Sequence, residues 1–119
     1  MELFDVSKVY QEFTYPKEFL KIVELNLVDF DFWYLMSKEQ VETRIEGLKV
    51  RYPNRKLIPF ARRDDNDDIA CFEMKKGNNV QIIHDFASEG YEQRKQYNSF
   101  WSWFNDAIKE MIEEEQRND

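Results

Sequence analysis

The chain has 119 residues, of which 42% are hydrophobic, 34% charged and 16% aromatic, and this length and composition predict one folded domain over residues 1–119. No apolar run approaches the ~20 residues of a membrane-spanning helix. The first residues lack the basic start and apolar block of a secretory signal, so we expect a cytoplasmic protein without a membrane span. The single cysteine, Cys71, excludes an internal disulfide and a cysteine-based zinc knuckle.

The net charge of −7 is distributed unevenly along the chain. Residues 61–119 carry fourteen acidic and eight basic side chains, whereas residues 1–60 carry ten and nine. Surplus negative charge repels phosphates, so we do not expect direct nucleic-acid binding. It suits a basic partner, although surplus carboxylates also serve simply to keep a protein soluble.

The first part of the chain predicts helices and one short strand. A short helix is expected over residues 7–13, and Pro16 suits the first turn of a second helix. The apolar residues of that second helix recur at helical spacing: Phe19, Leu20, Val23 and Leu27. The aromatic run at residues 32–35 predicts a short strand.

The clearest helix start lies at Ser37. Gln40 stands three residues later, and the pair forms a capping box in which each side chain binds the backbone N–H of the other. Pro53 ends the helix, because the residue before a proline avoids helical backbone angles. The apolar face is Val41, Ile45, Leu48 and Tyr52.

Three strands are predicted next, over residues 56–62, 69–74 and 80–86. Both connections are short and polar, and the second contains the Gly and Asn that positive-φ turns require. Short connections between successive strands predict an antiparallel meander. Residues 69–72 are apolar on both faces, which predicts a central strand covered on both sides.

A polar loop over residues 88–96 and a long helix from Asn98 or Ser99 complete the predicted fold. The helix carries an apolar stripe expected to pack on the sheet: Tyr97, Phe100, Trp101, Phe104, Ala107, Ile108, Met111 and Ile112. Trp103 lies beside this stripe, and we favour a place in the core over a partner contact. The last five or so residues are expected to fray. The fold class is therefore α+β, with a three-strand antiparallel meander plus one short strand, packed with flanking helices.

Residues 64–68 form an acidic turn for which three roles are open. Asp64, Asn66 and Asp68 match the opening of a calcium loop, but Ile69 replaces its glycine and Lys75 replaces its final glutamate. Such residues also make side-chain turns that keep a strand end soluble. The third role is a protein-binding edge with four carboxylates: Asp64, Asp65, Asp67 and Asp68.

Cys71 and His84 are the candidates for a nucleophile and its base. A cysteine in an apolar strand most often serves as a small hydrophobic residue, and burial makes a thiol inert. His84 and Asp85 are adjacent in a strand, so their side chains point to opposite faces. We find no phosphate loop, second histidine or nucleophile elbow. We therefore expect no enzymatic activity, no cofactor and no catalytic metal.

A basic stretch spans residues 49–63 and contains no acidic residue: Lys49, Arg51, Arg55, Lys56, Arg62 and Arg63. It could contact nucleic acid or another anion. The more common role of such residues is to complement a helix dipole and to charge the edges of strands.

The order and spacing of several short motifs resemble the SUKH superfamily, the Smi/Knr-type domain. The resemblance covers residues 14–111 and rests on these motifs: Pro16–Leu20, Trp33–Leu35, Ile58–Ala61, the turn through Asn66 and Asp67, Cys71, His84–Phe86, Phe100 and Phe104. The sequence departs from the family at residues 25–28 and at Asn66, where glycines are usual.

The resemblance implies an α+β fold without catalysis. Most bacterial members are similar to immunity proteins of polymorphic toxin systems, which bind a cognate toxin, often a nuclease, and block it. Eukaryotic relatives act as regulatory scaffolds with endogenous partners, and this is the alternative function. A metal-dependent enzyme that uses the acidic turn is a third.

A nuclease must hold phosphate in a basic cleft, which an acidic inhibitor can approach and occupy. We expect the contact residues in the acidic turn and in a second loop with Glu89, Tyr91 and Glu92. The sequence leaves the toxin, the contact surface and the oligomeric state open.

Overall fold

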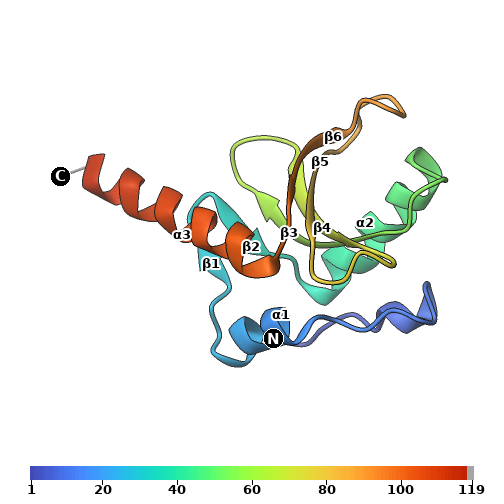
Figure 1. Cartoon of the computed structure of the whole chain (residues 1–119), viewed down its shortest axis with the longest axis horizontal. Coiled ribbons are helices and arrows are strands. Elements are labelled where there is room, and N and C mark those ends of the chain that lie inside the picture. Colours follow the sequence, from blue (N-terminus) through green and yellow to red (C-terminus); the bar gives the residue numbers. More distant parts are fainter. Residues whose placement is uncertain (118–119) are drawn as a thin grey trace.

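The computed structural model describes residues 1–117 and shows an α+β fold in which a six-stranded antiparallel sheet packs with three α-helices (Figure 1). The strands are β1 (Asp29–Phe30), β2 (Trp33–Leu35), β3 (Leu57–Arg63), β4 (Asp68–Glu73), β5 (Val80–His84) and β6 (Gln93–Tyr97). Their order in the sheet follows their order in the chain. The predicted meander of β3, β4 and β5 is confirmed, and β2 is the predicted short strand.

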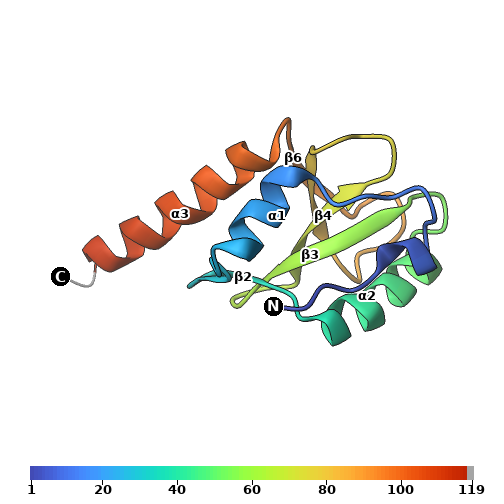
Figure 2. The same ribbon diagram turned by 90° about the horizontal axis from the view of Figure 1, so that it is seen from below.

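The helices cover both faces of the sheet. They are α1 (Lys17–Glu24), α2 (Lys38–Arg51) and α3 (Phe100–Arg117), preceded by a short 3-10 helix at Val6–Lys8. α2 packs on one face, while α1 and the first half of α3 lie side by side on the other (Figures 1 and 2). The second half of α3 projects beyond the sheet. Within residues 1–117, no helix is both long and apolar enough to cross a membrane.

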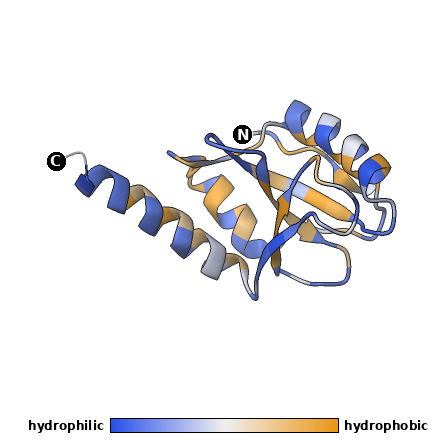
Figure 3. Cartoon of the chain, turned by 90° about the horizontal axis from the view of Figure 1, so that it is seen from above, coloured by the Kyte–Doolittle hydropathy of each residue, from blue (hydrophilic) through white to orange (hydrophobic). Residues whose placement is uncertain are grey.

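The larger part of the core lies between the sheet and the α1–α3 layer. Its centre is aromatic: the rings of Phe60 and Phe72 stack with centroids 4.4 Å apart, and Trp103 meets Phe60 edge-on at 5.0 Å. Trp103 is 1% exposed, so the predicted place in the core is confirmed. The apolar strands β3, β4 and β5 run through the middle of the fold (Figure 3).

α2 forms as the sequence predicts. The Ser37 N–H donates to Gln40 Oε1 at 2.8 Å, and the Gln40 N–H donates to Ser37 Oγ at 3.2 Å, which completes the capping box. The four predicted apolar residues, Val41, Ile45, Leu48 and Tyr52, are all buried. With residues of β3, β4 and β5, the last two form a second cluster on this face of the sheet.

The sheet is wider than predicted, because β1 and β6 were not expected. β1 has only two residues, and the first four residues of β6 lie inside the segment predicted as a polar loop over residues 88–96. Its last residue, Tyr97, was predicted on the apolar stripe of the last helix but lies in this strand instead. β6 is an edge strand whose first four residues are exposed, so its sequence lacks the apolar alternation of a half-buried strand.

Several helix predictions also need correction. The helix predicted over residues 7–13 is only the single 3-10 turn, and Pro16 precedes α1 as its N-cap. Of the predicted apolar face, Phe19 is buried, but Leu20 is exposed and Ile22 takes its place in the core. Leu27 lies beyond the end of α1 at Glu24 and is also exposed. In α3 the core face is Phe100, Trp103 and Ala107, which leaves the predicted core residues Trp101 and Ile112 exposed. Residues 115–117, expected to fray, are helical, and the rest of that expected segment lies outside the described residues.

Candidate partner-binding surface

Three connections lie side by side at one end of the strands. In an antiparallel meander every second connection lies at the same end, so the β1–β2, β3–β4 and β5–β6 connections are neighbours. The Asp64 N–H donates to the Phe32 carbonyl at 2.8 Å, and the Asp85 N–H donates to the Asp67 carbonyl at 3.2 Å. We call residues 31–32, 64–67 and 85–92 the loop edge. It unites the two segments that the sequence marks separately as contact candidates.

The four aspartates of the acidic turn differ in their surroundings. Asp65 receives two hydrogen bonds from Arg63, at 2.7 and 3.0 Å, and these bonds lower the pKa of the Asp65 carboxyl. Asp68 is mostly buried and binds His84 Nδ1 at 3.0 Å and Arg94 Nε at 3.3 Å. Asp64 and Asp67 are exposed and form no ion pair with another residue of the described chain. These two carboxylates are therefore the ones open to a partner.

In the β5–β6 loop, Tyr91 is 82% exposed and Glu89 is also exposed. Glu92 is buried instead: its carboxylate accepts hydrogen bonds from Arg55 Nη1 at 3.0 Å and from the Gly90 N–H at 2.7 Å. Burial raises the pKa of Glu92, but these bonds and its own backbone N–H outweigh burial and lower it. Glu92 therefore shapes the loop, and the structure removes it from the surface that a partner could touch.

Phe86 belongs to the same surface: it was predicted as the last residue of a strand, but β5 ends at His84. Its side chain is 63% exposed and its φ is +71°, an uncommon conformation for a bulky residue. The Arg51 guanidinium lies over the ring, 4.3 Å from the centroid. The signal in the sequence is an apolar residue directly after the polar pair His84 and Asp85, where β5 ends.

Asp85 holds this loop to α2. Its carboxylate is buried and accepts hydrogen bonds from Arg44 Nη1, Arg51 Nε and Arg51 Nη2, each at 2.8 Å, and from the Phe86 N–H at 2.8 Å. The Tyr52 hydroxyl adds a hydrogen bond of 2.7 Å to the Ala87 carbonyl. The exposed aromatic rings therefore lie on a loop that these hydrogen bonds hold to α2 and Tyr52.

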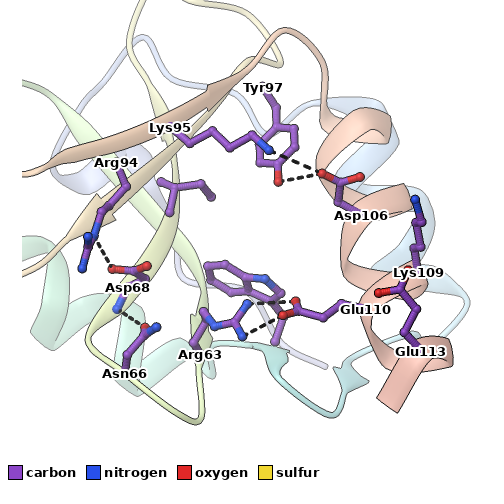
Figure 4. A pocket seen from close by; sticks show the side chains of 12 residues that line it. Arg63, Asn66, Asp68, Arg94, Lys95, Tyr97, Asp106, Lys109, Glu110 and Glu113 are labelled. Carbon is purple, nitrogen blue, oxygen red and sulfur yellow. Dashed lines mark hydrogen bonds and ion pairs between the residues drawn. The ribbon is translucent and has the colours of Figure 1, made fainter. Parts of the chain in front are cut away.

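An open cleft of about 510 Å³ adjoins the loop edge, between β6 and α3 (Figure 4). Ion pairs cross it: Arg63 binds Glu110 with two contacts of 2.9 Å, and Asp106 accepts from the Tyr97 hydroxyl at 2.9 Å and meets Lys95 at 3.6 Å. The lining carries four basic and four acidic side chains. Its charges are balanced, and the ion pairs that cross it hold α3 on the sheet.

The candidate nucleophile and base do not meet. Cys71 is fully buried in the cluster under α2, and burial raises the pKa of its thiol well above the ordinary value. His84 follows Ile83, a member of that cluster, so its side chain points to the other face, where it pairs with Asp68. Among residues 1–117, no three His, Cys, Asp or Glu side chains converge as a metal-binding group would.

The basic stretch over residues 49–63 is largely used within the fold. Arg51, Arg55 and Arg63 each bind buried or half-buried carboxylates. Arg62 lies over the Tyr34 ring, 5.5 Å from its centroid. Only Lys49 and Lys56 remain as exposed basic side chains of this stretch, so it forms no continuous basic surface.

Comparison with known proteins identified no relative: no family model, no curated protein and no solved structure matches this chain.

Proposed function

We propose that this protein is a binding module of the SUKH type, which neutralises a basic protein toxin by forming a stoichiometric complex with it. The observation that carries the proposal is the loop edge, where exposed carboxylates and two exposed aromatic rings share one surface. The resemblance in sequence motifs supports the immunity function, and the cognate toxin would be a nuclease or another enzyme with a basic cleft.

The charge of the molecule supports a basic partner. The net charge of −7 attracts a basic protein over a distance, and complementary charges at the contact raise the rate of association. Asp64, Asp67 and Glu89 stand exposed on the loop edge, where a partner's lysines and arginines can reach them. A nuclease cleft that binds phosphate presents such residues.

The aromatic residues support a specific contact. Tyrosine and phenylalanine contribute large apolar area and few rotatable bonds, and aromatic side chains often dominate the energy of an interface. Phe86 and Tyr91 lie on a loop already fixed by Asp85 and Arg55. Binding would therefore cost little additional ordering of the loop.

The first experiment is affinity capture of the tagged chain from its native cells, with the captured proteins identified by mass spectrometry. An immunity protein captures one basic protein at about equal stoichiometry, and co-expression then protects cells from that protein's toxicity. Reproducible capture of endogenous regulatory proteins alone, without protection against a toxin, would favour the scaffold function instead.

With the captured partner in hand, the contact surface can be tested by charge. The triple variant Asp64→Asn, Asp67→Asn, Glu89→Gln should slow association and reduce its dependence on salt, because three attractive charges are lost. The matched control is Glu39→Gln, Glu42→Gln, Glu46→Gln, which removes three exposed carboxylates of α2. Equal effects of both triple variants would show that net charge alone acts, and would remove the loop edge from the interface.

A further inference from the structure

The side of α3 that faces away from the cleft carries a second unpartnered surface. Trp101 is 45% exposed and Ile112 is 46% exposed. Phe104, Ile108 and Met111 lie between them and are half-buried. Residues at these spacings share one side of a helix. We call this set of five residues the α3 shoulder.

The body of the protein leaves the two ends of the shoulder exposed, while Phe104, Ile108 and Met111 between them pack partly against the core. α1 has eight residues and lies beside the start of α3, where Phe19 meets Phe100 with ring centroids 6.0 Å apart. α3 has eighteen residues, and its second half extends past the sheet (Figures 1 and 2). Ile112 lies in this second half of α3 and is exposed.

We propose that the α3 shoulder is the contact between two copies of this chain, paired antiparallel about a two-fold axis. Trp101 and Ile112 are eleven residues apart, which is about 16 Å along a helix. In an antiparallel pair, Trp101 of each copy lies opposite Ile112 of the other, and the half-buried shoulder residues meet near the axis. A two-fold contact uses the same surface on both copies, so it needs a surface that complements itself.

The charges at the two ends of the shoulder complement each other in this arrangement. Beyond Ile112, Glu115 is exposed three residues further along, on the shoulder's side of the helix. Glu113 instead lines the cleft, and Glu114 pairs with Arg117 at 3.3 Å. Beside the start of α3, Lys17 and Lys21 are exposed on α1. Antiparallel pairing directs Glu115 of one copy towards the lysines of the other, and it also opposes the two helix dipoles. Parallel pairing would bring the two Glu115 side chains together at one end. This charge pattern selects a second copy as the occupant.

Sedimentation equilibrium of the full chain tests the proposal, with concentrations from micromolar to millimolar at physiological ionic strength. We expect a monomer–dimer equilibrium. Ile112→Glu should raise the dissociation constant by more than about tenfold, because each dimer loses two apolar contacts and gains two charges. The control is Val50→Glu, which changes an equally apolar residue on α2 that is 81% exposed. It should leave the dissociation constant within about twofold of the wild-type value.

A charge exchange tests the orientation. Glu115→Lys alone and Lys21→Glu alone should each weaken the dimer, and the double variant should recover most of the loss, because opposite charges again face each other. Thermal unfolding of each variant shows that the monomer still folds. A wild-type chain that stays monomeric over the whole concentration range would overturn the proposal. So would equal weakening by Ile112→Glu and Val50→Glu.

Discussion

The Asp85 carboxylate accepts hydrogen bonds from two arginines of α2 and from the backbone of the next residue. It is buried, and the two arginines remain partly open to water. A buried carboxylate is tolerated only when it is paired, and here the pairing fixes the backbone at Phe86, where φ is positive. One residue thereby stabilises the conformation that exposes the Phe86 ring.

Asp85→Ala should lower the free energy of unfolding by about 3 kcal/mol, because Arg44 and Arg51 lose their buried partner. Urea unfolding followed by circular dichroism measures the change. Asp67→Ala is the control: the Asp67 side chain is exposed on the neighbouring turn, so its loss should change stability by less than about 0.5 kcal/mol. Similar values for the two variants would contradict the structural role of Asp85.

Glu92 illustrates what sequence reasoning lacks at the scale of a residue. A loop with Glu89, Tyr91 and Glu92 presents three polar or aromatic side chains, and nothing in their order separates them. The structure separates them through Arg55, which lies 37 positions from Glu92 and takes its carboxylate into the fold. Such distant pairing leaves no local signal, so the loop could be predicted as a contact candidate but its inward-facing member could not.

Elements with strong local signals were predicted well. The capping box and the apolar face of α2, and the apolar runs of β3, β4 and β5, follow from short-range periodicity. β1 and β6 form for another reason: a neighbouring strand offers unpaired backbone groups, and even a short or polar segment can bind them. This tertiary pairing is also why the sheet has six strands where four were expected.

Arg55 joins three elements and gives stability a dependence on pH. It follows α2 and binds Glu73 at the end of β4 and Glu92 just before β6. Burial raises the pKa of both glutamates, but their hydrogen bonds outweigh burial and hold each pKa below the ordinary 4.5. The unfolded chain therefore binds protons more readily than the folded one. The stabilisation is complete above the unfolded pKa and is lost as pH falls through the folded pKa.

Arg55→Met should lower the free energy of unfolding by about 2–3 kcal/mol near neutral pH, since two largely buried carboxylates lose their partner. The difference from the wild type should narrow as pH falls from about 6 to about 3, because the glutamates then become protonated in both proteins. Denaturant unfolding across this pH range measures it. The control is Lys56→Met, which changes the exposed residue next to Arg55. Its free energy of unfolding should depend on pH as that of the wild type does. A constant difference at every pH would mean that Arg55 acts through packing alone.

At the scale of the whole molecule, β3 and β4 contribute to both halves of the core. Ile58 and Phe72 face the α1–α3 layer, whereas Leu57 and Cys71 face α2. The two clusters thus use opposite sides of the same strands, and Val41 and Ile45 of α2 also belong to the larger one. Loss of packing on one side therefore exposes strands that the other side needs. The sequence indicates this arrangement in residues 69–72, which are apolar on both faces. It does not indicate the loop edge, because that surface arises only when the complete meander is assembled.

The two halves should therefore unfold together, and the chain carries a natural probe on each side. Trp33, Trp101 and Trp103 all report on the α1–α3 side. Cys71 reports on the α2 side, where burial raises the pKa of its thiol and excludes reagents. Thiol labelling measured over a range of denaturant concentrations should give the same free energy of unfolding as tryptophan fluorescence, within about 0.5 kcal/mol. The double variant Cys71→Ala, Val50→Cys carries its thiol at an exposed position of α2. It should label at once, which shows that the reagent is active. If Cys71 labels at a markedly lower free energy, α2 opens on its own and the shared strands do not couple the two halves.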